Sequence, residues 1–227
     1  ILFGYPGHEK AILYRKGYVI GYNPETKVPD WVSYHFTDAY LIKKAGRINN
    51  FRPDPDLIPG QRAELVDYNR SGYDRGHLAP AGDMTRNAQT MSESFLLSNM
   101  APQIGAGFNR GIWKKLETKV RGWVRQRKNI YVLTGPIYVD PHYKTIGPNR
   151  VGVPTHFYKI VVSCSETGQN LDAIAFILPN KRNPDALLPQ FITTIDEVEK
   201  LTNLDFLHDL DDSTEVQLEA QKSTMWP

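Results

Sequence analysis

Alternation of apolar and polar positions predicts short strands over much of this chain. The first 23 residues alternate in brief stretches separated by Gly and Pro, which is typical of strands joined by turns. Further strands are predicted at residues 31–36, 129–138, 155–163 and 171–178. The last two lie on either side of a turn at Gly168, so we expect them to pair as a hairpin.

Residues 108–127 form the clearest helical pattern. Apolar side chains recur on one face at Ile112, Trp113, Leu116, Val120, Trp123 and Val124. At about 100° per residue, Asn109 falls near the middle of this face and Glu117 lies about 80° away on its edge. A second helix is predicted at residues 192–207, and residues 209–227 are expected to form a polar, partly loose tail.

The whole chain is consistent with one domain. Its 227 residues allow one sizeable core, and 41% hydrophobic with 23% charged residues is ordinary for a globular protein. No repeat, low-complexity tract or linker divides it. We therefore predict a single α+β domain over residues 1–227, in which helices flank a central, mostly antiparallel sheet.

The net charge is only +2, but the charges are unevenly distributed. Residues 110–128 carry eight basic side chains and one acidic side chain, so this stretch favours a polyanionic partner. Residues 196–219 carry nine acidic side chains and one lysine, which we interpret as a solvated helix face and tail.

Several classes of protein are excluded by composition. The single cysteine, Cys164, allows neither an intrachain disulfide nor a zinc site built from several thiolates. The six histidines are scattered, and no pair has the spacing of a zinc motif. No apolar run is long enough to span a membrane, and no signal peptide is visible. The chain begins at Ile1 rather than Met, which favours a processed or trimmed product.

Candidate chemistry is concentrated in Asp74-Arg75-Gly76-His77. The unperturbed pKa of His77, about 6.5, allows proton transfer near neutral pH. Arg75 offers a planar fork of donors that suits a phosphate. A base beside a phosphate clamp is the minimum needed to attack a phosphodiester with water. In isolation, this tetrapeptide is more often a turn with a surface ion pair and a satisfied histidine.

Asn109 is the second candidate, because a polar group in an apolar face needs a partner. The sequence leaves two partners open, the backbone at a helix cap or a metal ion. Mg²⁺ keeps several waters and needs only one or two protein oxygens, so Asn109 suffices if an acid such as Glu117 holds those waters. The candidate set also includes Asn99, in an apolar segment, and the arginines Arg47, Arg75 and Arg121.

Several segments, taken in order, resemble one family. They are residues 31–34, Arg47, residues 50–54, 74–77, 79–83, 97–103, 108–113, 116–117, 134–136 and 153–159. Together they resemble the DNA/RNA non-specific endonucleases of the ββα-metal, or His-Me finger, superfamily. That family includes secreted bacterial sugar-non-specific nucleases and mitochondrial endonuclease G. The resemblance covers most of the chain and implies that its fold carries a ββα-metal active-site motif.

The resemblance also implies roles for the candidates. His77 would be the general base that activates water, and Asn109 would be the only direct protein ligand of Mg²⁺, or of Mn²⁺ in its place. Glu117 would hold metal-bound water, and Asn99 would help to orient the site, through His77.

Three arginines would contact the scissile phosphate or its charged transition state, namely Arg47, Arg75 and Arg121. Arg52 is an alternative to Arg47 because it lies close by in the same loop. Other polar residues in the matched segments are expected to be structural or to line a groove, and these are Asp74, His156 and Lys159.

The implied substrates are DNA and RNA, with little sequence preference, because contacts to phosphates carry no sequence information. A secreted or periplasmic bacterial enzyme is the leading expectation and an organellar one the alternative. A homodimer and an inhibitor protein are both left open.

Three other interpretations also stay open. The chain can be a catalytically inactive nucleic-acid-binding protein on the same fold, or a metal-dependent phosphodiesterase for small or lipid-linked phosphates. It can also be a soluble α+β domain in which Asn109 is a helix cap and His77 a core residue.

Overall fold

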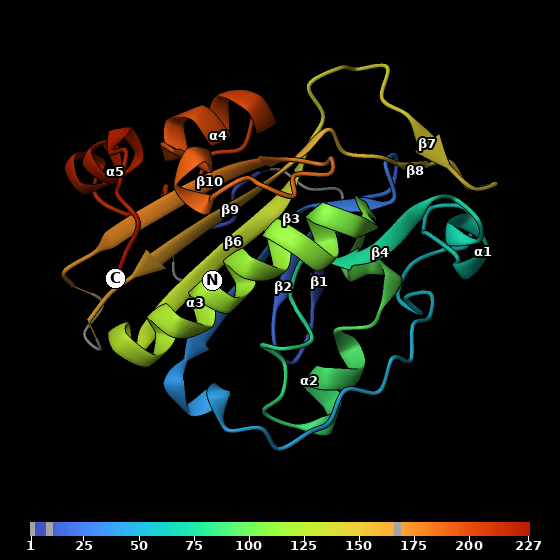
Figure 1. Cartoon of the computed structure of the whole chain (residues 1–227), viewed down its shortest axis with the longest axis horizontal. Coiled ribbons are helices and arrows are strands. Elements are labelled where there is room, and N and C mark those ends of the chain that lie inside the picture. Colours follow the sequence, from blue (N-terminus) through green and yellow to red (C-terminus); the bar gives the residue numbers. More distant parts are fainter. Residues whose placement is uncertain (1–2, 8–10, 166–168) are drawn as a thin grey trace.

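The computed structural model describes residues 3–7, 11–165 and 169–227. Its centre is a seven-stranded sheet in the order β1-β2-β3-β6-β9-β10-β11, with every neighbouring pair antiparallel (Figure 1). The strands are β1 (Ala11–Tyr14), β2 (Val19–Asn23), β3 (Val28–Thr37), β6 (Asn129–Ile137), β9 (His156–Ser163), β10 (Asp172–Pro179) and β11 (Ile192–Thr193). The predicted pairing of the β9 and β10 segments is confirmed, while the turn at Gly168 lies outside the described residues.

Helices cover both faces of this sheet, so each face buries its own apolar cluster. In β9, Phe157 and Val161 face the cluster under α3 (Lys114–Arg127). Between them in the alternation, Tyr158 and Ile160 face the cluster under α4 (Ile195–Thr202) and α5 (Asp212–Ala220). Figure 1 shows α3 lying along the sheet, and α4 and α5 side by side over β10. The predicted α+β class, with a central antiparallel sheet flanked by helices, is confirmed.

A smaller ββα unit lies on the α3 side of the sheet. It consists of β4 (Tyr73–His77), β5 (Met100–Ile104), the helical segment η3 (Gly105–Trp113) and α3. The strands are antiparallel, with His77 opposite Met100 and Tyr73 opposite Ile104. This unit therefore brings the end of the predicted motif close to the start of the predicted helix.

Short elements connect these layers. They are η1 (Asp38–Leu41), α1 (Leu65–Tyr68), α2 (Ala88–Glu93), η2 (Leu97–Asn99), β7 (Thr145–Ile146), β8 (Val151–Gly152) and η4 (Leu188–Phe191). Within the described residues, no helix combines the length and apolar character that crossing a bilayer requires.

The prediction of one regular helix over residues 108–127 was wrong in its first part. The backbone leaves helical geometry at Gly111, with φ −119° and ψ −110°, and regular α3 begins only at Lys114. A helical wheel drawn through both parts therefore does not give the angle between Asn109 and Glu117. The structure instead leaves Asn109 partly buried, outside the apolar face where the wheel placed it.

The C-terminal region is also more ordered than the sequence predicts. The helix predicted over residues 192–207 is shorter, because Asn203 takes a left-handed conformation (φ 56°) and ends α4. The tail expected to be loose contains α5, which begins where the side chain of Asp211 caps the Thr214 N–H at 3.1 Å. Beyond α5, Trp226 packs edge-on against Trp123 of α3, with ring centroids 5.2 Å apart.

Candidate active site

His77 is the last residue of β4, and the glycine before it sets the spacing of the two strands. A Cβ on Gly76 would lie 2.1 Å from the side-chain amide of Gln103, which is fully buried beneath it. Contacts that short do not occur between real atoms, so any larger residue would push β4 away from β5. Gly76 therefore fixes where His77 leaves the strand.

The imidazole of His77 is enclosed by two aromatic rings. Its centroid lies 5.6 Å from that of Phe51 and 5.0 Å from that of Phe95, both in edge-to-face geometry. Burial, followed by the positive charges of Arg47 and Arg75, lowers the pKa of His77 to about 3. The ring is therefore neutral near pH 7, and one of its two nitrogens carries a free lone pair.

Two guanidinium groups stack on the same aromatic pair. Arg75 lies over Phe51 at 4.2 Å, and Arg47 lies over Phe95 at 5.0 Å. Arg47, Arg75 and Phe51 line a cleft of about 440 Å³ together with Asn109. The structure thus brings Arg47, Arg75 and Asn109 to one cleft, with His77 packed against its wall.

Asn109 is held by the acid at the start of the sequence motif. Its Nδ2 donates to Asp74 Oδ2 at 2.9 Å, and Asp74 also pairs with Arg110 at 3.5 Å. The amide is therefore oriented through its nitrogen, and Oδ1 makes no hydrogen bond to the described residues. This observation fits a hard cation, which takes amide and carboxylate oxygens as ligands. Asp74, expected to be structural, thus supports a candidate ligand.

Asn99 lies behind His77 rather than in the cleft. Its Oδ1 accepts from the Ala79 N–H, and its Nδ2 donates to the carbonyls of Ala79 and Ser94, each at 2.9 Å. Its own carbonyl accepts from the Leu78 N–H at 3.0 Å. The side chain thus holds the backbone just beyond His77, and its hydrogen bonds do not go to the imidazole.

Glu117 and Arg121 belong to a second polar cluster between α3 and the sheet. Arg121 donates to the buried carboxylate of Asp83 at 2.7 Å, and the hydroxyl of Tyr34 donates to the same carboxylate at 2.9 Å. Burial, then the charge of Asp83, raises the pKa of Glu117, against the opposing charges of Lys159 and Arg121. The charge of Arg47 also acts on Glu117, which links this cluster to the cleft.

Lys159 is part of this cluster, although sequence reasoning gave it no catalytic role. Its side chain is 1% exposed, and Nζ lies 4.7 Å from the ring of Trp113 with no hydrogen-bond partner among the described residues. Burial lowers its pKa. The signal was present in the sequence, because Lys159 replaces an apolar residue between Phe157 and Val161 on one face of a buried strand.

The surroundings of their guanidinium groups distinguish Arg52 from Arg47. Arg52 donates to the carbonyl oxygens of Asn50 and Ser92, at 3.2 and 2.9 Å. Arg47 is exposed and lines the cleft. The geometry therefore gives Arg52 a role in holding its loop and leaves Arg47 beside the candidate site.

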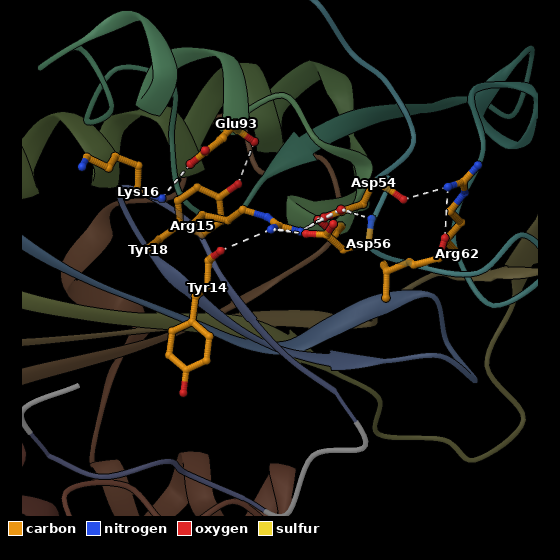
Figure 2. Close-up of polar contacts among 10 residues, drawn as sticks. Tyr14, Arg15, Lys16, Tyr18, Asp54, Asp56, Arg62 and Glu93 are labelled. Carbon is orange, nitrogen blue, oxygen red and sulfur yellow. Dashed lines mark hydrogen bonds and ion pairs between the residues drawn. The ribbon is translucent and has the colours of Figure 1, made fainter.

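Sequence reasoning missed a buried acid that supports the same loops. Asp54 accepts two hydrogen bonds from Arg15, at 2.7 and 2.6 Å (Figure 2). It accepts a third from the hydroxyl of Ser98. Ser98 immediately precedes Asn99 in the chain. Arg15 also reaches Asp56, as Figure 2 shows. Arg62 donates to the backbone carbonyl of Asp54 at 2.8 Å.

Fold and cleft together define a class of enzyme. Guanidinium groups around a cleft attract an anion, and a neutral imidazole at its wall can remove a proton from water, as a hydrolase of phosphodiesters requires. Comparison with known sequences agrees with this class. The chain belongs to the DNA/RNA non-specific endonuclease family, whose sequence model matches residues 1–213. The family implies nucleic-acid substrates and a divalent metal cofactor.

Relatives match this chain over most of its length. It is 38% identical over 223 residues to the mitochondrial nuclease of Saccharomyces cerevisiae, covering 90% of this chain and 68% of the relative. It is 39% identical over 226 residues to nuclease C1 of Cunninghamella echinulata var. echinulata, covering 93% and 88%. Mitochondrial endonuclease G of Homo sapiens is 33% identical over 216 residues, covering 90% and 72%.

A solved structure shares the fold. A chain from the EndoG/EndoGI complex superposes with a TM-score of 0.86 at 36% identity, covering 92% of this chain and 90% of that one. Several relatives are described as mitochondrial, so the leading expectation of a secreted or periplasmic bacterial enzyme finds no support among them.

Proposed function

We propose that this protein is an Mg²⁺-dependent endonuclease that hydrolyses DNA and RNA without sequence preference. The observation that carries the proposal is the neutral His77 ring packed against a cleft that also presents Arg47, Arg75 and Asn109. His77 accepts the proton of the attacking water. Because its Nε2 is sealed from solvent and unpartnered among the described residues, Nδ1 is the ring nitrogen left to accept that proton.

The arginines bind the phosphate. Arg75 and Arg47 stack on aromatic rings, which holds both guanidinium groups beside the cleft at little entropic cost. Their positive charges stabilise the negative charge that develops on the phosphate. Arg121 contributes more indirectly, since its guanidinium is already paired with Asp83. Asn99 is a positioning residue in this scheme.

Asn109 is the proposed protein ligand for Mg²⁺ or Mn²⁺, through Oδ1, and Glu117 would accept hydrogen bonds from ion-bound water. When bound, the ion supplies positive charge that stabilises the leaving oxygen. The amide and carboxylate donors match a hard cation, and the fixed orientation of Asn109 on Asp74 suits a single protein ligand.

The proposal also covers the length of the substrate, the extent of the domain, the location of the protein and its partners. The basic side chains of residues 110–128 favour a long polyanion over a small phosphodiester. Residues 1–227 are proposed to form one nuclease domain. The mitochondrial relatives support an organellar location, and the relative in complex with EndoGI supports regulation by an inhibitor protein. A homodimer stays an open proposal.

The test is digestion of supercoiled plasmid and of total RNA with Mg²⁺, with Mn²⁺ and with a chelator. His77→Ala should lower kcat by orders of magnitude while nucleic-acid binding is kept, and the exposed His142→Ala should behave as wild type. Asn109→Ala should lose cleavage at ordinary Mg²⁺ levels.

Two results would contradict the proposal. Near-normal cleavage by His77→Ala would show that His77 is not the general base. Binding without cleavage by the wild type, in either metal, would favour an inactive nucleic-acid-binding protein.

A further inference from the structure

Lys159 lies in the middle of the apolar sheet face that α3 covers. It belongs to β9, an interior strand of the seven-stranded sheet (Figure 1). In the strand pairing it stands between Thr134 of β6 and Phe176 of β10, and all three residues are buried. Along β9 it shares its face with Phe157 and Val161, which belong to the cluster under α3. A lysine in this position places its ammonium group inside the protein.

The ammonium of Lys159 has little compensation close by. Its Nζ is sealed from solvent and makes no hydrogen bond to the described residues. The ring of Trp113, 4.7 Å away, offers a cation–π contact, which is worth far less than the hydration that burial removes. A buried charge persists when a charge of opposite sign lies near it. A carboxylate is therefore needed to keep this ammonium group charged in the fold.

The contacts within the polar cluster under α3 show which carboxylate is available. Asp83 already has two partners, because Arg121 donates to it at 2.7 Å and the hydroxyl of Tyr34 at 2.9 Å. Glu117 makes no hydrogen bond or ion pair with the described residues. Lys159 and Glu117 are thus the two charged members of the cluster that are left to balance each other.

The electrostatic interactions support the same pairing. Burial and then the charge of Asp83 raise the pKa of Glu117, and Lys159 opposes that rise more strongly than any other base does. Burial lowers the pKa of Lys159, and Glu117 opposes that fall more strongly than Asp83 does. On Asp83 itself, Arg121 acts more strongly than Lys159. Arg121 is therefore the partner of Asp83, and Lys159 that of Glu117.

We propose that Lys159 is a positioning residue for the nuclease reaction, and that its buried ammonium group is the counter-charge that keeps Glu117 an anion. This inference rests on the function proposed above, in which Glu117 accepts hydrogen bonds from ion-bound water. A carboxylate accepts through both oxygens, whereas a protonated carboxyl group turns one of them into a donor. Lys159 acts through Glu117 without touching the substrate. A strand of the main sheet thereby sets the charge of a residue in the ββα unit.

The first measurement is a double-mutant cycle in the metal-free protein, read by urea unfolding at pH 7. It compares wild type, Lys159→Met, Glu117→Gln and the double variant, since methionine fills a similar volume without the charge. The double variant should have a folded-to-unfolded ratio at least about tenfold above the value that the two single changes predict by addition, because neither charge is then left alone.

A control cycle pairs Glu117→Gln with Lys119→Met. Lys119 is exposed on α3, two residues from Glu117, so the two side chains do not face each other. The same charge is removed at a similar distance along the chain. The effects of these two substitutions on the folded-to-unfolded ratio should multiply to within about twofold.

The second measurement is the pH dependence of plasmid cleavage with Mg²⁺. Removing the ammonium group raises the pKa of Glu117, so its carboxylate forms only at higher pH. The acid limb of kcat should therefore move up by about one pH unit or more in Lys159→Met, and by less in Lys159→Arg, which keeps the charge. The other titratable and charged groups that act on Glu117 are the same in both variants, namely Tyr34, Arg47, Asp83 and Arg121.

Stabilities that add to within about twofold would overturn the inference, and so would an unmoved acid limb in a folded Lys159→Met. Lys159 would then be a packing residue against Trp113. If Lys159→Met alone does not fold, the double variant should fold, and a double variant that is also unfolded would count against the pairing. A wild type that cleaves neither DNA nor RNA would refute the proposed function instead, and the unfolding cycle would still decide whether Lys159 and Glu117 form a pair.

Discussion

Arg15 offers a matched pair of substitutions, because one guanidinium binds two carboxylates in opposite surroundings (Figure 2). It reaches Asp54 at 2.6 Å and Asp56 at 2.7 Å, but the Asp54 side chain is 0% exposed and that of Asp56 is 60% exposed. Removing one partner of a buried pair costs about 3–5 kcal/mol, whereas exposed pairs contribute below about 1 kcal/mol. Asp54→Asn should therefore lower the free energy of unfolding by about 3–5 kcal/mol, and Asp56→Asn by under about 1 kcal/mol.

The measurement is urea unfolding of wild type and both variants at pH 7. The midpoint should fall strongly for Asp54→Asn with the m-value unchanged, since the native surface is the same. Nuclease activity at low temperature adds a second readout, because Asp54 also holds Ser98, next to Asn99. Equal losses of stability in both variants would refute the reasoning from burial.

Three further predictions use other contacts. Gly76→Ala should cost about 1–3 kcal/mol by overpacking and reduce activity, whereas Gly122→Ala, with open space around it in α3, should add about 0.5–1 kcal/mol in the same unfolding assay. Because the pKa of His77 falls to about 3 in the fold, the unfolded chain binds its proton first, and the free energy of unfolding should decrease from about pH 6.5 towards pH 3 relative to His77→Phe. Arg47→Ala should reduce kcat/KM with stability unchanged, whereas Arg52→Ala should lose about 1–3 kcal/mol of stability through its unpaired carbonyls.

These three each have an outcome that would count against them. A stable, active Gly76→Ala would mean that β4 and β5 can separate without moving the site. An unchanged pH dependence in His77→Phe would mean that the imidazole titrates normally in the fold. A loss of stability in Arg47→Ala would place that side chain in the loop framework instead of the cleft.

Much of the sheet could be predicted from alternation alone. A strand with one buried face alternates between apolar and polar residues, and this alternation can be seen in the sequence. Both faces of β9 are buried, so its sequence is a nearly continuous apolar run. The break before α3 could not be predicted in this way, because the backbone angles of Gly111 leave no trace in the apolar spacing. The ordered α5 was missed for a related reason: its nine residues are mostly polar, and the apolar side chain that they bury is Leu218.

In the candidate site too, some features could be predicted from the sequence and others could not. His77, Arg75, Arg47 and Asn109 were selected from the sequence because their types suit the chemistry, and the structure places the last three around one cleft with His77 packed against Phe51 in its wall. The residues that hold these side chains in place could not be predicted from the sequence. The contact between Asp74 and Asn109 spans 35 residues, and Asp54 meets Arg15 across 39. Such pairs depend on how loops meet, and a single sequence gives no signal for that.

The break at Gly111 has a consequence for how this site tolerates change. Asn109 takes its orientation from Asp74 on β4, whereas Glu117 and Arg121 move with α3 and its contacts to the sheet. The cleft and the polar cluster under α3 are therefore mounted independently, so a shift of α3 along its axis need not rotate the Asn109 amide. Substitutions in the packing of α3 can then move Glu117 and Arg121 while the Asn109 amide keeps its orientation on Asp74, so redesign and natural drift can alter the two groups of residues separately.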